Sequence, residues 1–322
     1  MWQMGYQKPR IDHVKNIQQS CQFNCVSGGG SYDEVGNGIK VGDWIEINEN
    51  YQSITYVGEY KNGLKFGKWE TKNQGLLIPQ FLCISGGGSY DESSNGIKIG
   101  NWIDIDVKSC FFQQIIYQGE YRNGKKIGLW DTWQQKEGKN NQNKKIGGGS
   151  YDEDGNEFKI GKWTDFEYEQ RQEKIIILNG IYENGNKIGR WNIFFEGSEI
   201  GGGFYDQEGD GIKIGKWIDL DERFYQEKQI THIGKYIQGR KAGQWDIYWN
   251  WNENEKIGGG VYDEEGNGFK VGMWIDLDED FNYWKQKILN GKYIMGKKVG
   301  SWQEMYLNNK KNKNLRIRDY EN

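Results

Sequence analysis

Proline, cysteine and histidine are scarce in this chain of 322 residues, which contains 2 Pro, 4 Cys and 2 His. Because proline cannot donate a backbone hydrogen bond, its scarcity suits long β-ladders. The cysteines show no CxxC pair and no histidines at zinc-site spacing. Cys25 and Cys83 occupy the same repeat position, and we interpret them as small buried side chains, with a disulfide between them as the less favoured alternative.

Long apolar runs and an excess of positive charge are also missing. Hydrophobic residues make up 35% of the chain, and no stretch approaches the ~18 consecutive apolar residues typical of a membrane-spanning helix. The net charge of -4 argues against a general nucleic-acid-binding protein. The N-terminal segment has no apolar core of the signal-peptide type, so we expect a cytoplasmic protein.

What the chain has instead is glycine, with 47 residues, and aromatic side chains, at 15%. They fall in two alternating repeats, a short one such as "GEYKNGLKFGKWE" (58–70) and a long one such as "GGGSYDEVGNGIKVGDWIEI" (28–47). Both contain Gly-x-Tyr, a turn and Lys-x-Gly-x-Trp. Five long-short pairs start near residues 28, 86, 147, 201 and 258, and their tryptophans are Trp44, Trp69, Trp102, Trp130, Trp163, Trp191, Trp217, Trp245, Trp274 and Trp302.

Each unit has the pattern of a β-hairpin. Asn-Gly pairs such as Asn62-Gly63 and Asn37-Gly38 predict tight turns, because such turns need positive φ. Gly opposite a Trp or Tyr ring leaves room for the ring, and stacked hairpins bury their aromatics against their neighbours. We therefore predict an all-β fold, an elongated single sheet of about ten tandem hairpins over residues 28–306. Residues 1–27 would form an N-terminal arm or cap, 75–83 an extra strand, and 307–322 a polar, partly basic tail.

Several motifs resemble sites but have simpler explanations. The Gly-Gly-Gly runs lack the rest of a phosphate-binding loop, and we interpret them as turn glycines. "YDEDGNE" (151–157) lacks the glutamate that ends a calcium loop. His232 occupies a bulky slot of the repeat, and recurring pairs such as Asp219/Asp221 indicate a structural ladder rather than one catalytic pair. The sequence predicts no catalytic, metal or cofactor site, and therefore not an enzyme.

A row of lysines is the strongest functional signal, because a lysine lies four residues before every repeat tryptophan. Such a row could attract anionic lipid head groups. The favoured alternative is that each lysine stem packs over a tryptophan ring with some cation–π stabilisation. The lysines are Lys40, Lys65, Lys98, Lys126, Lys159, Lys187, Lys213, Lys241, Lys270 and Lys298.

The short units resemble the MORN repeat (membrane occupation and recognition nexus), and most closely its Trp-ending, antitoxin-type variant. The long "GGGSYDE" units are similar to tandem arrays of ciliates. The resemblance covers residues 28–306. It implies a twisted sheet of hairpins with aromatics lining a trough, and a scaffolding role, often in cytoskeletal, basal-body or ciliary assemblies. Some members of that family are proposed to bind lipid head groups.

These observations lead to a hypothesis of a protein-binding scaffold without cofactors, with other proteins rather than nucleic acid as partners. Exposed aromatic residues would anchor them, and the candidates are Trp249, Trp251, Phe111, Phe112 and Trp284. A peripheral membrane module that uses the lysine row is the first alternative. An aromatic-cage protein for glycans or small ligands is the second.

Overall fold

The computed structural model describes residues 28–51, 54–73, 84–93, 95–107, 115–134, 143–168, 175–250, 254–307 and 316–320. Within these residues the chain forms 21 β-strands and no helix. The predicted arm at 1–27, the predicted strand at 75–83 and all four cysteines lie outside them.

The strands follow one another along the chain as the predicted hairpins. The long hairpins are β1 (Gly29–Tyr32) and β2 (Lys40–Ile47), β5 (Ile84–Tyr90) and β6 (Lys98–Ile105), β9 (Lys144–Tyr151) and β10 (Lys159–Tyr168), β13 (Ser198–Tyr205) and β14 (Lys213–Leu220), and β17 (Glu255–Tyr262) and β18 (Lys270–Leu277). The short hairpins are β3 (Ile54–Lys61) and β4 (Leu64–Asn73), β7 (Ile115–Arg122) and β8 (Lys125–Gln134), β11 (Ile175–Glu183) and β12 (Asn186–Phe195), β15 (Ile230–Ile237) and β16 (Arg240–Trp249), and β19 (Lys287–Ile294) and β20 (Lys297–Tyr306). The last strand is β21 (Arg316–Tyr320).

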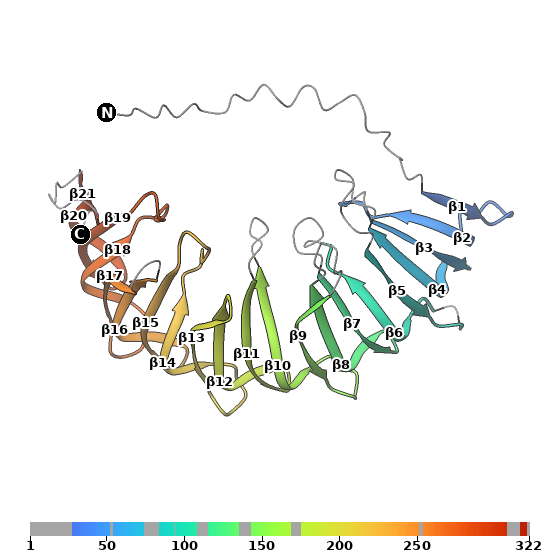
Figure 1. Cartoon of the computed structure of the whole chain (residues 1–322), viewed down its shortest axis with the longest axis horizontal. Coiled ribbons are helices and arrows are strands. Elements are labelled where there is room, and N and C mark those ends of the chain that lie inside the picture. The colour runs from blue at the N-terminus through green and yellow to red at the C-terminus, as the bar shows by residue number, and fades with distance from the viewer. Residues whose placement is uncertain are drawn as a thin grey trace, which may run out of the picture.

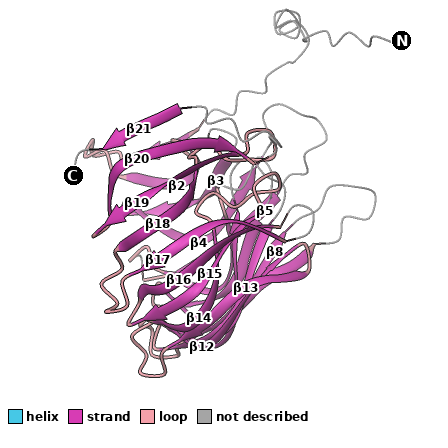
Figure 2. Ribbon diagram, turned by 90° about the vertical axis from the view of Figure 1, so that its left-hand side faces the viewer, coloured by secondary structure: helices cyan, strands magenta, loops and turns pink. Residues whose placement is uncertain are grey.

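Each strand pairs antiparallel with the next one in the chain, so that all 21 form one open sheet. The predicted all-β, single-sheet array of tandem hairpins is therefore confirmed. Figure 1 shows that the sheet bends into a crescent, with β1 at one end and β21 at the other. The turns within hairpins lie on its outer rim, and the connections between hairpins lie on its inner rim (Figure 1). The side view in Figure 2 shows the twist of the strands.

The two kinds of hairpin turn differently. In the short hairpin β3–β4, Asn62 and Gly63 have φ of 52° and 81°, as a tight two-residue turn requires. The long hairpin β1–β2 instead has a loop in which the Asp33 carboxylate accepts the Ile39 N–H at 2.9 Å. Asn37 does not have positive φ there, so the predicted tight turn at Asn37-Gly38 is wrong. The aspartate, which begins the loop in every long unit, organises it instead.

The core is a ladder of aromatic rings with one ring on each strand. Tyrosines of the odd-numbered strands alternate with tryptophans of the even-numbered strands, from Tyr32 on β1 to Tyr320 on β21. Neighbouring rings stand nearly perpendicular, with centroids 5.0–6.3 Å apart. Such edge-to-face pairs each stabilise by ~0.5–1.5 kcal/mol beyond the area they bury. The ladder is thus a continuous core that depends on contacts between neighbouring strands.

Glycine makes room for every tryptophan of this ladder. A Cβ on Gly58 would lie 2.3 Å from the Trp69 ring, and the nine equivalent glycines are as close to theirs. The Gly-Gly-Gly runs extend this crowding along the strand. In β13, a Cβ on Gly202 would lie 2.1 Å from the Trp191 carbonyl oxygen of the neighbouring strand. The prediction that these runs are turn glycines is therefore wrong, because they lie within strands at points of close backbone approach.

The array extends beyond its predicted end at residue 306. Residues 316–320, assigned above to a polar, partly basic tail, form β21 and pair with β20. Tyr320 continues the ladder on Trp302, with centroids 6.2 Å apart. The Arg318 guanidinium binds Glu304 at 2.6 Å, and Glu304 is buried. Arg318, one of the basic residues of this segment, thus forms an ion pair that holds the last strand to the sheet.

Candidate functional site

The ten lysines of the repeat form one row above the aromatic ladder. Each ammonium nitrogen lies 4.1–4.5 Å from the ring centroid of the tryptophan four residues later. The interpretation that the lysine stems pack over tryptophan rings is confirmed. We call this row, together with the rings beneath it, the lysine groove.

Each long hairpin supplies one carboxylate to the groove, two residues after its tryptophan. Asp165 accepts hydrogen bonds from Lys159 and from the Tyr182 hydroxyl, both at 2.6 Å. The equivalent carboxylates with the same two kinds of donor are Glu46, Asp104, Asp219 and Asp276. These bonds confirm a structural ladder of acids balanced by lysines.

The Glu46 carboxylate is held in its ionised form by its hydrogen-bond partners. Burial alone would raise its pKa, but hydrogen bonds from Lys40, Tyr60 and Lys65 outweigh burial and lower the pKa to about 2. Glu46 therefore carries a full negative charge at neutral pH and offsets the charge of Lys40 in its own hairpin.

The short hairpins have no acid at this position in their first four copies, where Thr71, Thr132, Ile193 and Ile247 stand instead. No carboxylate of the described residues lies within 4.0 Å of the Lys126 or Lys187 ammonium group. Burial lowers the pKa of both lysines, and the charges of neighbouring lysines act in the same direction. Lys126 and Lys187 thus differ from the lysines of the long hairpins, each of which has a carboxylate at 2.6–2.7 Å.

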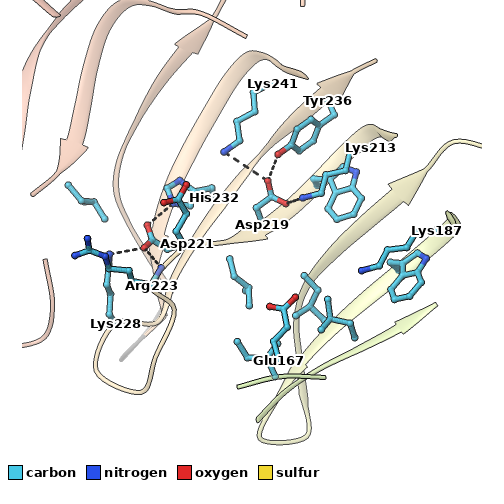
Figure 3. A pocket seen from close by; sticks show the side chains of 18 of the residues that line it. Glu167, Lys187, Lys213, Asp219, Asp221, Arg223, Lys228, His232, Tyr236 and Lys241 are labelled. Carbon is cyan, nitrogen blue, oxygen red and sulfur yellow. Dashed lines mark hydrogen bonds and ion pairs between the residues drawn. The ribbon is translucent and has the colours of Figure 1, made fainter. Parts of the chain in front are cut away.

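A pocket of about 710 Å³ lies in the groove between β10 and β18. Figure 3 shows Asp219 bound to Lys213 and Tyr236, and Asp221 bound to Lys228 and His232. The nitrogen Nε2 of His232 lies 3.1 Å from the Asp221 carboxylate, so His232 has a polar partner and does more than fill a bulky slot. Burial raises the pKa of Asp221, but hydrogen bonds from His232 and Lys228 outweigh this and hold it well below its usual range.

A second pocket, of about 460 Å³, continues the groove toward β7. Lys126, Lys159 and Lys187 line it, with aromatic walls that include Trp130 and Trp163. It shares Lys187, Leu178 and Glu167 with the larger pocket, so the two form one continuous channel.

Two connections on the inner rim fold into ordered loops, between β14 and β15 and between β18 and β19. Each buries a phenylalanine: Phe224 packs on Phe195 and Phe281 packs on Trp249, with ring centroids 5.3 and 5.6 Å apart. The Tyr283 N–H donates to the Glu227 carbonyl oxygen at 3.0 Å and joins the two loops. The loops therefore support one another at this end of the groove.

The predicted interaction residues have different environments. Trp284 lies at the tip of the second loop and is 82% exposed, as an anchor requires. Trp249 is only 9% exposed because Phe281 and Tyr283 cover it, so the expectation of an exposed Trp249 is wrong. Trp251, Phe111 and Phe112 lie outside the described residues.

Replacing Trp249 with alanine is expected to lower the free energy of unfolding by about 3 kcal/mol or more, because it removes the ring against which Phe281 packs. Urea unfolding followed by circular dichroism measures this change. Trp284→Ala, which removes an exposed ring, is the matched control and should leave stability within about 0.5 kcal/mol. Equal stabilities of the two variants would contradict the packing described above.

The described residues contain few other features that would indicate chemistry. No group of three or more His, Cys, Asp or Glu side chains among them is placed to hold a metal ion. The Asp152 carboxylate, in the segment that resembles a calcium loop, accepts the N–H groups of Asn156 and Phe158 instead. Among the residues that the structure describes, no helix is long and apolar enough to cross a membrane.

No protein-family model and no curated protein sequence matches the chain. The functional argument therefore depends on the groove and on the loops.

Proposed function

We propose that this chain is a non-enzymatic, MORN-like scaffold that binds other proteins in the cytoplasm, in cytoskeletal or ciliary assemblies. The observation that carries the proposal is the exposed Trp284 on a loop that is itself firmly held. Aromatic side chains that are already ordered before binding lose little entropy, and tryptophan is prominent among residues that dominate binding energy.

The loop that presents Trp284 is fixed by three contacts. Phe281, four residues after the end of β18, is 1% exposed and anchors the loop to the sheet. The Asn282 side chain accepts the Trp284 N–H at 2.8 Å. Tyr283 stacks edge-on against Trp284, with ring centroids 4.9 Å apart. A partner would therefore meet a rigid aromatic pair at the inner rim.

The two alternative functions fit the groove less well. The ladder tryptophans are at most 7% exposed, and lysines cover their faces, so the rings offer no open face to a sugar. A flat bilayer would have to reach lysines that line the floor of a channel. Both geometries favour a protein partner over a glycan or a membrane.

Trp284→Ala is expected to reduce the recovery of a bound partner about tenfold or more in affinity pull-downs from the native cell, because such anchors contribute about 2 kcal/mol or more. Quantitative mass spectrometry of cross-linked pull-downs provides the measurement. Met273→Ala, which removes a side chain 62% exposed elsewhere on the sheet, is the control and should leave recovery unchanged. Undiminished recovery with Trp284→Ala would refute this role.

A further inference from the structure

The lysine groove contains more positive charge than its own acids balance. Of its ten lysines, the five in long hairpins each have a carboxylate of the same hairpin at 2.6–2.7 Å. Among the short hairpins, Lys65 lies 3.0 Å from Glu46. Lys298 lies 3.8 Å from Asp276, and Lys241 lies 4.0 Å from Asp219. Lys126 and Lys187, near the middle of the array, are the least compensated.

Three of the acids near these two lysines already accept hydrogen bonds. Asp104 binds Lys98 and Tyr121, and Asp165 binds Lys159 and Tyr182. Glu157 accepts hydrogen bonds from the Lys125 ammonium group and the Lys126 backbone N–H. Glu167 lies at the border of the two pockets and is exposed to solvent. An added anion would therefore not need to displace an internal acid.

Lys126 and Lys187 line the same 460 Å³ pocket, together with Lys159 and the hydroxyl-bearing Thr132 and Thr164. Its two acids are Asp165, which is already bound, and Glu167 at its border. The larger pocket differs, because its cations Lys213 and Lys228 are paired with Asp219 and Asp221. The smaller pocket is thus lined by three lysines and two acids, whereas the larger pocket has six acids against five lysine and arginine side chains.

The spacing of the two lysines matches an extended chain. They lie on β8 and β12, four strands apart, which corresponds to about 19 Å across a sheet. An extended peptide covers this distance in roughly six residues. The channel continues on into the larger pocket, so a chain can pass through it rather than end in it.

We propose that the groove between β8 and β12 binds an extended acidic peptide segment, whose carboxylates pair with Lys126 and Lys187. This inference depends on the proposed scaffold function, but it concerns a different surface from Trp284. The peptide would lie across the strands, with its carboxylates over the short hairpins and its backbone along the lysine stems and aromatic edges.

The test is binding of a fluorescein-labelled decaglutamate peptide to the full chain, measured by fluorescence anisotropy at low and at near-physiological salt. The wild type should bind, with affinity that falls as salt rises. Lys126→Gln with Lys187→Gln should weaken binding about tenfold, whereas Lys126→Arg with Lys187→Arg should retain it. Lys162→Gln with Lys216→Gln removes the same charge from exposed lysines outside the two groove pockets and should change affinity less than twofold.

Four results would overturn the proposal: no binding by a wild type that circular dichroism shows to be folded, equal losses in both glutamine variants, binding of inorganic phosphate without binding of the peptide, or lysine-dependent binding to phosphatidylserine vesicles in place of the peptide. The Trp284→Ala variant should bind decaglutamate like the wild type. Peptide binding can therefore fail while Trp284-dependent capture persists, and the reverse also holds, so the two functions are tested separately.

Discussion

Replacing Gly202 with alanine is expected to destabilise the protein by more than about 4 kcal/mol, which is exceptional for a single substitution. Gly202 has a φ of 125°, and its added Cβ would lie 2.1 Å from the Trp191 carbonyl oxygen. That oxygen belongs to the backbone of β12, which pairs with β13 at this point, so it cannot move without disturbing the ladder. Urea unfolding followed by tryptophan fluorescence, together with soluble yield, provides the measurement.

Gly29 offers a control at the same position of the repeat. It has a φ of 147°, but it lies in the edge strand β1, and no atom lies within 4 Å of its added Cβ. Gly29→Ala should therefore cost only about 1–3 kcal/mol of backbone strain. If the two variants proved equally stable, the close approach of neighbouring strands would not be what requires the Gly-Gly-Gly runs.

The hairpins and the aromatic ladder could be predicted because their causes are local and repeated. Asn62-Gly63 reveals its turn through a backbone preference. The same Gly, Tyr and Trp positions recur in ten units, so one hairpin predicts the rest. Gly202 could not be placed in this way, because the atom that crowds it lies on another strand. For the same reason β21 could not be predicted, because Arg318 and its partner Glu304 lie on different strands and meet only in the folded sheet.

In the candidate site, contacts within one strand could be predicted from the sequence, whereas contacts between distant segments could not. The spacing of Lys187 and Trp191 within one strand predicts that the lysine packs over the ring. Trp249 is covered by Phe281, which lies in a loop two strands further along the chain. The sequence around Trp249 does not reveal this contact. The two acids of the pair Asp219/Asp221 look equivalent in the sequence. They differ in the structure, because only Asp221 meets a lysine from the adjacent loop.

Replacing Trp191 with alanine is expected to remove about 3–5 kcal/mol of stability and to divide the array. Trp191 is 2% exposed and lies in the ladder between Tyr182 and Tyr205, at centroid distances of 5.1 and 6.2 Å. Lys187 covers it at 4.2 Å. Because each repeat in such an array is stabilised only by contacts with its nearest neighbours, loss of this ring weakens the coupling between the two halves of the array. Urea unfolding should become broader, with a smaller dependence on denaturant.

Trp44→Ala separates the loss of a ring from the loss of coupling. Trp44 has the same contacts, with Tyr32 and Tyr60 on either side and Lys40 above, but it lies on the second strand of the sheet. Its removal should loosen only the first hairpin and leave the main transition sharp. If Trp191→Ala also unfolds in one sharp transition, the array folds as a single cooperative unit, and coupling between neighbours does not limit its stability. If the transition broadens for Trp191→Ala alone, coupling between the two halves of the array depends on the contacts of this ring with its neighbours.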